Sequence, residues 1–336
     1  MQFSILSFPP EQPLTEGMKK FILIIIALAG FMHSNAQKQK ALFVIVDGVA
    51  YDVIQKLELP NLKRIAGKSG MGPTVVGGEK DGKTQSPTIS AVGYNTVLTG
   101  VWANKHNVWD NDIDSPNYKY PTIFRVFKDQ YPQRKIAIFS SWLDNRTKLA
   151  GDGLEQTGKL SFDHHFDGLE FDTINFPHDK DKKYMQRIDQ KVVEVAAQTI
   201  RDTAPDLSWV YLEYTDDMGH RHGDSEIYYQ SVKSADRMMG QLYDAIQFRE
   251  KNYKEDWLII ITTDHGRDAK TGHGHGGQSD RERSGWIVTN AKKLNKRFTE
   301  GKSELVDIFP TIAHHLKLDL AENVQAELEG RSLIAK

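Results

Sequence analysis

Residues 41–48 read ALFVIVDG, six apolar residues followed by an aspartate and a glycine. A continuous apolar run of this length suits a strand buried on both faces, at the centre of a sheet with helices on each side. Four further runs of this kind lie at 135–139, 209–214, 257–262 and 285–289. Helical patterns separate them, at about 49–68, 86–100, 121–131, 184–203, 224–250 and 303–317. This alternation predicts an α/β fold, a doubly wound and mostly parallel central sheet with helices on both faces.

The composition narrows the kinds of site that the chain can build. Its 336 residues are 39% hydrophobic, which is enough apolar material for one large α/β domain. The formal net charge is -2, so no overall basic field indicates nucleic-acid binding. The chain has no cysteine, which excludes disulfides, thiolate metal sites and cysteine nucleophiles. A metal ion would therefore be held by His, Asp, Glu and hydroxyl oxygens.

The first 36 residues are typical of an exported protein. Two lysines follow Met18, residues 21–32 form an apolar run too short to span a bilayer comfortably, and residues 34–36 read SNA, which suits a cleavage site. We expect residues 1–17 to be an upstream extension and Met18–Ala36 to be a signal peptide. The mature chain would begin at Gln37 and lie in the periplasm or outside the cell. No cysteine follows the apolar run, so we expect no lipid anchor and no stable membrane anchor.

Residues 37–336 show no internal repeat and no low-complexity linker, so we expect a single catalytic domain. The polar stretch 144–183 is rich in Asp, His and Gly. A structureless loop of this length is unusual in a compact domain. We therefore expect a small insertion or cap there that shapes the site.

Three of the expected strands are followed by carboxylates. Asp47 follows the first run, Asp216 lies just after the run 209–214, and Asp264 just after the run 257–262. One aspartate after a strand is commonly a helix cap, but ligands of open parallel sheets bind beyond the carboxyl ends of the strands. His220 lies four residues after Asp216, and His265 is adjacent to Asp264. These side chains predict a metal site at that edge of the sheet.

Two more histidines lie in residues 271–278, TGHGHGGQ, which could also be a flexible surface loop. Adding His273 or His275 to the five residues above gives more ligands than the four or so that one tetrahedral ion requires. The surplus favours two divalent ions about 4 Å apart, as used for displacement at phosphorus. Mixed carboxylate and imidazole ligands favour zinc, with manganese or iron as alternatives.

A hydroxyl nucleophile is expected in residues 86–111, SPTISAVGYNTVLTGVWANKHNVWDN. Such a group needs a metal ion to deprotonate it and a helix N-terminus to stabilise the nearby negative charge. Ser86, Thr88 and Ser90 all meet this requirement, and each could instead be the N-cap of the helix expected to end near Gly100.

The order of these motifs resembles the alkaline phosphatase superfamily. VDG, PTIS, TG, DN, DDMGH, TDHG and HGG follow one another as they do in that superfamily, and the likeness is strongest to its type I phosphodiesterase/nucleotide pyrophosphatase branch. It covers about residues 41–290. The resemblance implies an alkaline-phosphatase-like sheet, two zinc ions, and a hydrolase that acts on a small-molecule phosphoric ester.

The resemblance also implies roles for single residues. The branch has its nucleophile ten residues before the Gly of a TG pair, which is Ser90 here, and this would form a phosphoseryl-type intermediate. An Asn twenty-one residues after the nucleophile, here Asn111, helps to bind a phosphate oxygen. The implied ligands of one metal are Asp47, Ser90, Asp264 and His265. Those of the other are Asp216, His220 and His275, with His273 as the rival for the last position.

Serine instead of the branch's usual threonine leaves the preference for monoesters or diesters open. The alternatives are therefore a phosphomonoesterase, a phosphonate hydrolase or a phospho-transferase. Sulfatases of the superfamily need Pro and Arg where this chain has Val92 and Tyr94, which argues against sulfatase activity. An alternative that is not an enzyme is an inactive envelope protein that binds a metal ion or another ligand. The sequence does not indicate the oligomeric state.

Overall fold

The apolar run 41–46 belongs to β1 (Lys38–Val46) in a computed structural model, which describes residues 37–335. The expected extension and signal peptide, residues 1–36, lie outside the described residues. From Ala41 onward every residue of β1 is buried, as a strand covered on both faces requires.

Within residues 37–335, β1 lies inside an eight-stranded sheet with the order β4-β3-β5-β1-β6-β7-β2-β8. The other strands are β2 (Met71–Val75), β3 (Ile136–Ser140), β4 (His164–Phe166), β5 (Leu207–Leu212), β6 (Glu255–Thr262), β7 (Ser284–Thr289) and β8 (Ser303–Glu304). β5 pairs in parallel with both β1 and β3, and β3 pairs in parallel with β4. β7 is antiparallel to both of its neighbours, β6 and β2. The predicted α/β class and mostly parallel sheet are confirmed, and all five predicted strands are present.

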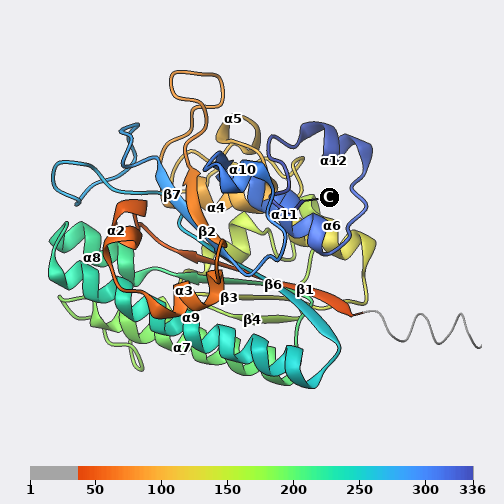
Figure 1. The fold of residues 1–336 in the computed structure, drawn as a ribbon, viewed down its shortest axis with the longest axis horizontal. Helices are drawn as coiled ribbons and strands as arrows, with labels where there is room; N and C mark the ends of the chain where they lie inside the picture. The colour runs from red at the N-terminus through yellow and green to blue at the C-terminus, as the bar shows by residue number, and fades with distance from the viewer. Residues whose placement is uncertain (1–36, 336) are drawn as a thin grey trace, which may run out of the picture. The chain divides into compact units, whose positions relative to one another are not determined.

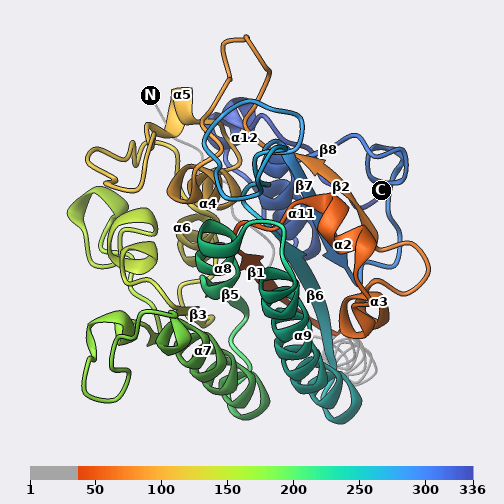
Figure 2. The same ribbon diagram turned by 90° about the vertical axis from the view of Figure 1, so that its left-hand side faces the viewer.

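Helices cover both faces of the sheet. On one face lie α2 (Tyr51–Lys56), α3 (Pro60–Ala66), α7 (Lys183–Asp202) and α9 (Glu226–Asn252), with α7 and α9 side by side (Figures 1 and 2). On the other lie α4 (Ser90–Thr99), α6 (Ile123–Gln130) and α11 (Ile308–His315). Leu42 and Val44 of β1 pack into the first layer and Phe43 and Ile45 into the second. Strand alternation thus divides the apolar side chains between two cores.

One prediction is wrong, because the helix expected at 49–68 is not continuous. The expected helix 49–68 is divided into α2 and α3, because Pro60 is the first residue of α3 and Leu59 before it is not helical. A proline has no backbone N–H to donate and disfavours helical geometry in the residue before it. None of the described helices is both long and apolar enough to cross a bilayer.

Several short elements were not predicted. They are β2, β4, β8, α5 (Ala103–His106), α8 (Tyr214–His222), α10 (Lys296–Thr299) and α12 (Glu322–Glu327). The stretch 144–183 holds the short helices η1 (Asn145–Leu149), η2 (Glu155–Thr157) and η3 (Leu169–Phe171). Its β4 pairs with β3, so part of this stretch extends the sheet edge.

Buried side chains at the centre of the sheet should contribute most to the free energy of unfolding. Phe43 is fully buried, and its ring stacks on Trp209 with the ring centres 5.7 Å apart. Phe43→Ala should lower the free energy of unfolding by about 3–5 kcal/mol, because it removes buried apolar surface and leaves a cavity. Urea denaturation measures this, with Ile174→Ala as the control. Ile174 is 89% exposed, so its truncation should change stability by less than about 0.5 kcal/mol. Equal effects of the two changes would contradict this account of the core.

Candidate metal centre and nucleophile

The three carboxylates come from three strands that are neighbours in the sheet, in the order β5-β1-β6. Asp47 directly follows β1, and Asp264 lies two residues after β6. Asp216 lies in the first turn of α8, the helix that follows β5. Adjacent strand ends thus bring together residues from distant parts of the chain, such as Asp47 and Asp264, which are 217 positions apart. The arrangement matches the general rule that open α/β sheets bind ligands beyond strand ends.

The first group of side chains consists of Asp47, Asp264 and His265, all buried. The Nε2 atom of His265 lies 3.3 Å from Asp47 Oδ1 and 3.2 Å from Asp264 Oδ2. It also lies 3.3 Å from the hydroxyl oxygen of Ser90. Four potential ligand atoms from three segments of the chain therefore converge on one small volume.

Each carboxylate of this group has one oxygen held by the protein. Asp47 Oδ2 accepts hydrogen bonds from the hydroxyls of Tyr94 and Tyr211, the latter at 2.7 Å. Asp264 Oδ1 accepts one from the backbone N–H of Gly48 at 3.1 Å. The other two oxygens, Asp47 Oδ1 and Asp264 Oδ2, are buried without a hydrogen-bond partner among the described residues. Buried oxygens of this kind are costly unless a cation neutralises them, so the group fits a metal ion.

Protonation in this group is set by burial. The Nδ1–H of His265 donates to the carbonyl of Gly266 at 2.9 Å, and burial lowers the pKa of His265 well below its ordinary value. Its ring is therefore neutral, with the Nε2 lone pair free. Burial, followed by the charge of Asp216, raises the pKa of Asp264 to about 8. Burial also raises the pKa of Asp47, as do the charges of Asp264 and Asp216. A divalent cation would reverse these shifts.

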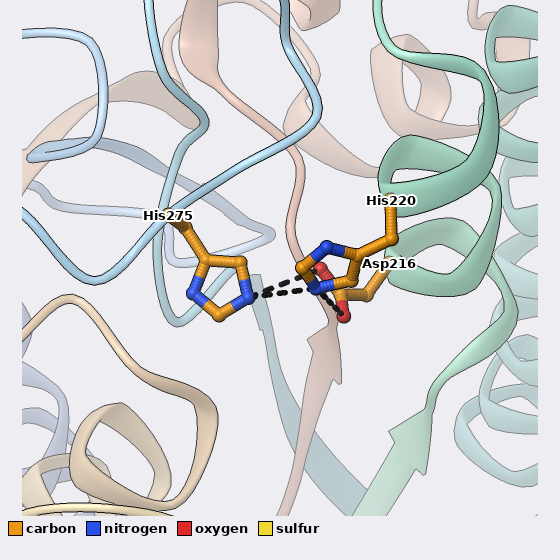
Figure 3. A group of neighbouring side chains, drawn as sticks. All are labelled: Asp216, His220 and His275. Atoms are coloured by element: carbon orange, nitrogen blue, oxygen red, sulfur yellow. Dashed lines mark hydrogen bonds and ion pairs between the residues drawn. The ribbon is translucent and has the colours of Figure 1, made fainter.

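The second group consists of Asp216, His220 and His275, shown in Figure 3. His220 Nε2 lies 3.1 Å from Asp216 Oδ2 and 2.9 Å from His275 Nε2. The Nδ1–H of His275 donates to the carbonyl of Thr88 at 2.9 Å, which leaves its Nε2 facing the group. Two imidazole nitrogens and a carboxylate facing one another form a suitable donor set for zinc.

The rival histidine lies elsewhere. The Nδ1 atom of His273 is 2.8 Å from the carbonyl of His220, and His273 does not belong to the group around Asp216. The rings of His265 and His275 stack with their centres 3.7 Å apart, so the two groups adjoin. Apart from His273, the structure thus brings together the metal-ligand candidates named from the sequence, in the two sets that the resemblance implies.

Arg267 is a residue of this site that the sequence reasoning missed. Its side chain is fully buried, and Nη1 donates to Asp216 Oδ1 at 2.6 Å. Its other nitrogens donate to the carbonyls of Gly272 at 2.5 Å and His273 at 2.7 Å. Burial alone would raise the pKa of Asp216, but its hydrogen bond with His220 and nearby positive charges, including that of Arg267, lower it. The one signal in the sequence is the position of Arg267 immediately after the TDHG motif.

Two glycines make this packing possible. Gly48 has φ +67°, and a Cβ there would lie 2.4 Å from Asp216 Oδ1 and 2.7 Å from Arg267 Nη1. A Cβ on Gly93, in α4, would lie 2.8 Å from the Cβ of Asp264. Any side chain at these positions would therefore separate the elements that carry the site.

Ser90 is the first residue of α4 and is 7% exposed. Asn111 lies beside it, and its Oδ1 accepts a hydrogen bond from the N–H of Ala91 at 3.0 Å. This bond leaves the amide N–H groups of Asn111 available to another acceptor. The helix N-terminus adds a partial positive charge next to the Ser90 hydroxyl.

The other two candidate nucleophiles, the hydroxyls of Ser86 and Thr88, form hydrogen bonds away from the two groups. Ser86 Oγ donates to the carbonyl of Thr84 and accepts from the N–H of Ala103. Thr88 Oγ1 donates to the carbonyl of Gly277 and accepts from the N–H of Gly276, both at 2.9 Å. Thr88 therefore anchors the loop that carries His275, a role that the sequence reasoning did not foresee.

A cavity of about 410 Å³ opens onto Ser90. Its lining consists of Asp47, Ser90, Tyr94, Asn111, Trp142, Glu170, His178, Tyr184, Met185, Tyr211, Glu213 and Asp216. A larger hollow of about 960 Å³ lies around α10, α11 and the C-terminal segment and contains none of the site residues. The smaller cavity is the one that can present a substrate to the site.

Comparisons with known proteins assign the chain to a family. A family model described as type I phosphodiesterase/nucleotide pyrophosphatase matches residues 41–273. Human ectonucleotide pyrophosphatase/phosphodiesterase family member 5 is 25% identical over 253 residues, which are 73% of this chain and 48% of that protein. The chain therefore spans about half the length of that relative.

Two solved structures are similar in fold. An inactive form of murine ectonucleotide pyrophosphatase/phosphodiesterase 5, in complex with AMP, has a TM-score of 0.59 at 16% identity, over 87% of this chain and 100% of that one. A 2-O GAG sulfatase has a TM-score of 0.61 at 11% identity, over 88% of this chain and 73% of that one. At these identities the likeness shows the fold alone.

The buried carboxylates should make stability depend on pH and on metal. A carboxyl whose folded-state pKa is raised, as that of Asp264 is from 3.8 to about 8, stabilises the fold at low pH, and this contribution is lost as pH rises through the folded value. Between about pH 7 and about pH 8, the metal-free protein should therefore lose stability as pH rises, in a range where His265 is mostly neutral even when the chain is unfolded.

Zinc should restore the lost stability, and its affinity should rise with pH because it competes with protons for the same oxygens. Urea denaturation with and without zinc, at several pH values in that range, measures both effects. Asp264→Asn should flatten the pH dependence. A metal-free protein whose stability does not change with pH would contradict the assignment.

Proposed function

Because the chain belongs to the type I phosphodiesterase/nucleotide pyrophosphatase family, we propose that it is a two-metal phosphoric ester hydrolase with Ser90 as its nucleophile. The observation that carries the proposal is the position of the Ser90 hydroxyl. It lies 3.3 Å from His265 Nε2, at a helix N-terminus, and lines the cavity together with Asn111.

The chemistry follows from these positions. Two divalent ions, most reasonably zinc, would lower the pKa of the Ser90 hydroxyl and neutralise the charge that develops on the leaving oxygen. Asp47, Asp264, His265 and Ser90 would hold one ion, and Asp216, His220 and His275 the other.

Ser90 attacks phosphorus and displaces the alcohol, which leaves a phosphoseryl intermediate that water hydrolyses. The amide of Asn111 and the N-terminus of α4 stabilise the negative charge on the non-bridging oxygens. Arg267 takes no part in the bond changes. By holding Asp216 Oδ1 it orients the carboxylate, so that Oδ2 faces His220.

Removing the Ser90 hydroxyl tests whether Ser90 is the nucleophile. Ser90→Ala should lower kcat by on the order of a thousandfold or more on a 4-nitrophenyl phosphodiester while the protein keeps most of its metal. Ser90→Thr should retain measurable activity because it keeps a hydroxyl in place. Acid quench during turnover, followed by peptide mapping, should find phosphate on Ser90.

Ser86→Ala is the matched control and should cost far less, since among residues 37–335 the Ser86 hydroxyl bonds only to Thr84 and Ala103. Thr88→Ala should instead lower metal content, because it frees the loop of His275. Near-normal turnover by Ser90→Ala with a full metal complement would mean that water attacks directly.

We also propose that the protein is exported and acts as a hydrolase outside the cytoplasm. Mass spectrometry of the protein recovered from its host's envelope or medium should find Gln37, cyclised or not, at the N-terminus. A mature N-terminus within residues 1–17 would contradict this, and cytoplasmic retention of the full chain would do the same.

A further inference from the structure

Helix α8 carries two residues of the second group, Asp216 and His220, but its own sequence does not cap its N-terminus. The side chain of the N-cap residue, Glu213, makes no capping hydrogen bond. The first N–H groups of a helix have no partner within the helix, and burying them without one costs free energy. The start of α8 therefore needs hydrogen-bond acceptors from another segment.

Asp189, in α7, supplies these acceptors. Its Oδ1 accepts a hydrogen bond from the N–H of Glu213 at 3.1 Å, and its Oδ2 accepts one from the N–H of Tyr214 at 2.9 Å. Its Oδ1 also accepts a hydrogen bond at 2.5 Å from the hydroxyl of Ser141, the residue that follows β3. One carboxylate of α7 thus connects the end of β3 to the first turn of α8.

Asp189 has no cationic side chain to compensate its charge. It is 2% exposed, and no lysine or arginine within residues 37–335 pairs with it. Burial raises the pKa of Asp189 to about 7, whereas its hydrogen bonds lower it. The partial positive charge at a helix N-terminus also favours a carboxylate. The charge of Asp189 and the N-terminus of α8 therefore stabilise each other.

The first turn of α8 sets the position of the second group. The N–H of Asp216 donates to the carbonyl of Glu213 at 2.9 Å, so this candidate ligand belongs to the turn that Asp189 holds. His220 lies one turn further along the same helix. His275 comes from a separate loop that is anchored on Thr88. A shift of α8 would therefore move Asp216 and His220 together relative to His275.

We propose that Asp189 is a positioning residue for the second metal group: it caps α8 from α7, holds Asp216 and His220 in place opposite His275, and so raises the affinity of the group for a metal ion. The inference rests on the proposed two-metal function. It adds a residue that does not line the cavity at Ser90. Residues that hold metal ligands from outside commonly change metal affinity by roughly 10–100-fold.

The test measures zinc affinity at one group at a time and needs no turnover. His265→Ala disables the first group, and His275→Ala disables the second. In the His265→Ala protein, Asp189→Asn should weaken zinc binding by about tenfold or more, because an amide has one acceptor oxygen and can hold only one of the two N–H groups of α8. In the His275→Ala protein the same change should leave zinc affinity nearly unaltered. Competition with a chromophoric chelator measures both dissociation constants.

Asp236→Asn is the matched control. Asp236 is a buried aspartate of α9, and it accepts the N–H groups of Asn61 and Leu62 at the start of α3, at 3.3 and 2.8 Å. Neither metal group includes a residue of α3. Asp236→Asn should cost a similar amount of stability in urea but leave zinc affinity unaltered at both groups. A loss of zinc affinity from this change would overturn the inference, because any lost helix cap would then have the same effect.

The zinc dependence of activity gives a second measurement. Asp189→Asn should raise the zinc concentration that gives half-maximal activity, and kcat at saturating zinc should return close to the parent value, because excess metal restores the occupied state by mass action. If Asp189→Asn does not fold, Ser141→Ala takes its place. It removes only the hydroxyl that holds Asp189 Oδ1, and it should weaken zinc binding at the second group alone, by a smaller factor.

The outcomes separate this inference from the proposed function. Equal losses of zinc affinity at both groups, or no loss at the second, would overturn the positioning role even if the parent protein hydrolyses phosphoric esters normally. A loss confined to the second group, in a parent protein that hydrolyses no phosphoric ester, would support the positioning role and contradict the proposed function.

Discussion

Asp47, Asp216 and Asp264 bring three carboxylates to the ends of three neighbouring buried strands, where Asp47 and Asp264 are buried and the Asp216 side chain is only 14% exposed. Such charges are tolerated only when donors or cations compensate them. In this protein, one oxygen of each carboxylate is held by a protein donor. Two tyrosine hydroxyls hold Asp47, a backbone N–H holds Asp264 and a guanidinium holds Asp216. The other oxygen of each carboxylate faces an imidazole nitrogen. The geometry of the site follows from this arrangement, in which the protein holds one oxygen and leaves the other directed at the histidines.

Much of the surrounding structure follows from that arrangement. Gly48 and Gly93 occur where a side chain would collide with Asp216 and Asp264, respectively. Arg267 is fully buried because it neutralises Asp216 and ties together the loop of His273. Thr88 joins the segment before the nucleophile to the loop of His275. Packing and electrostatics are therefore coupled, and a change at any of these residues would disturb candidate metal ligands that it does not itself provide.

The two sides of the cavity have different origins. The strand ends and α4 supply the carboxylates, imidazoles and hydroxyl, an arrangement suited to phosphoric ester chemistry in this family. Glu170 and His178 come from the segment 144–183, which adds the edge strand β4 and then continues to the cavity. Loops placed on a rigid sheet commonly carry specificity in this way.

The sequence by itself determined the fold class, the five main strands and the set of residues that converge at the site. Apolar runs of strand length predicted these strands, and the motif order singled out Ser90 and Asn111 as candidates. It did not determine the break at Pro60, the short edge strands or helix α8, because isolated short elements depend on contacts with distant segments. Only the tertiary structure showed that Tyr94, Tyr211 and Arg267 hold the carboxylates of the site. A tyrosine or arginine in a sequence gives no sign of which carboxylate it will meet, since burial and the choice of partner are set by strand order.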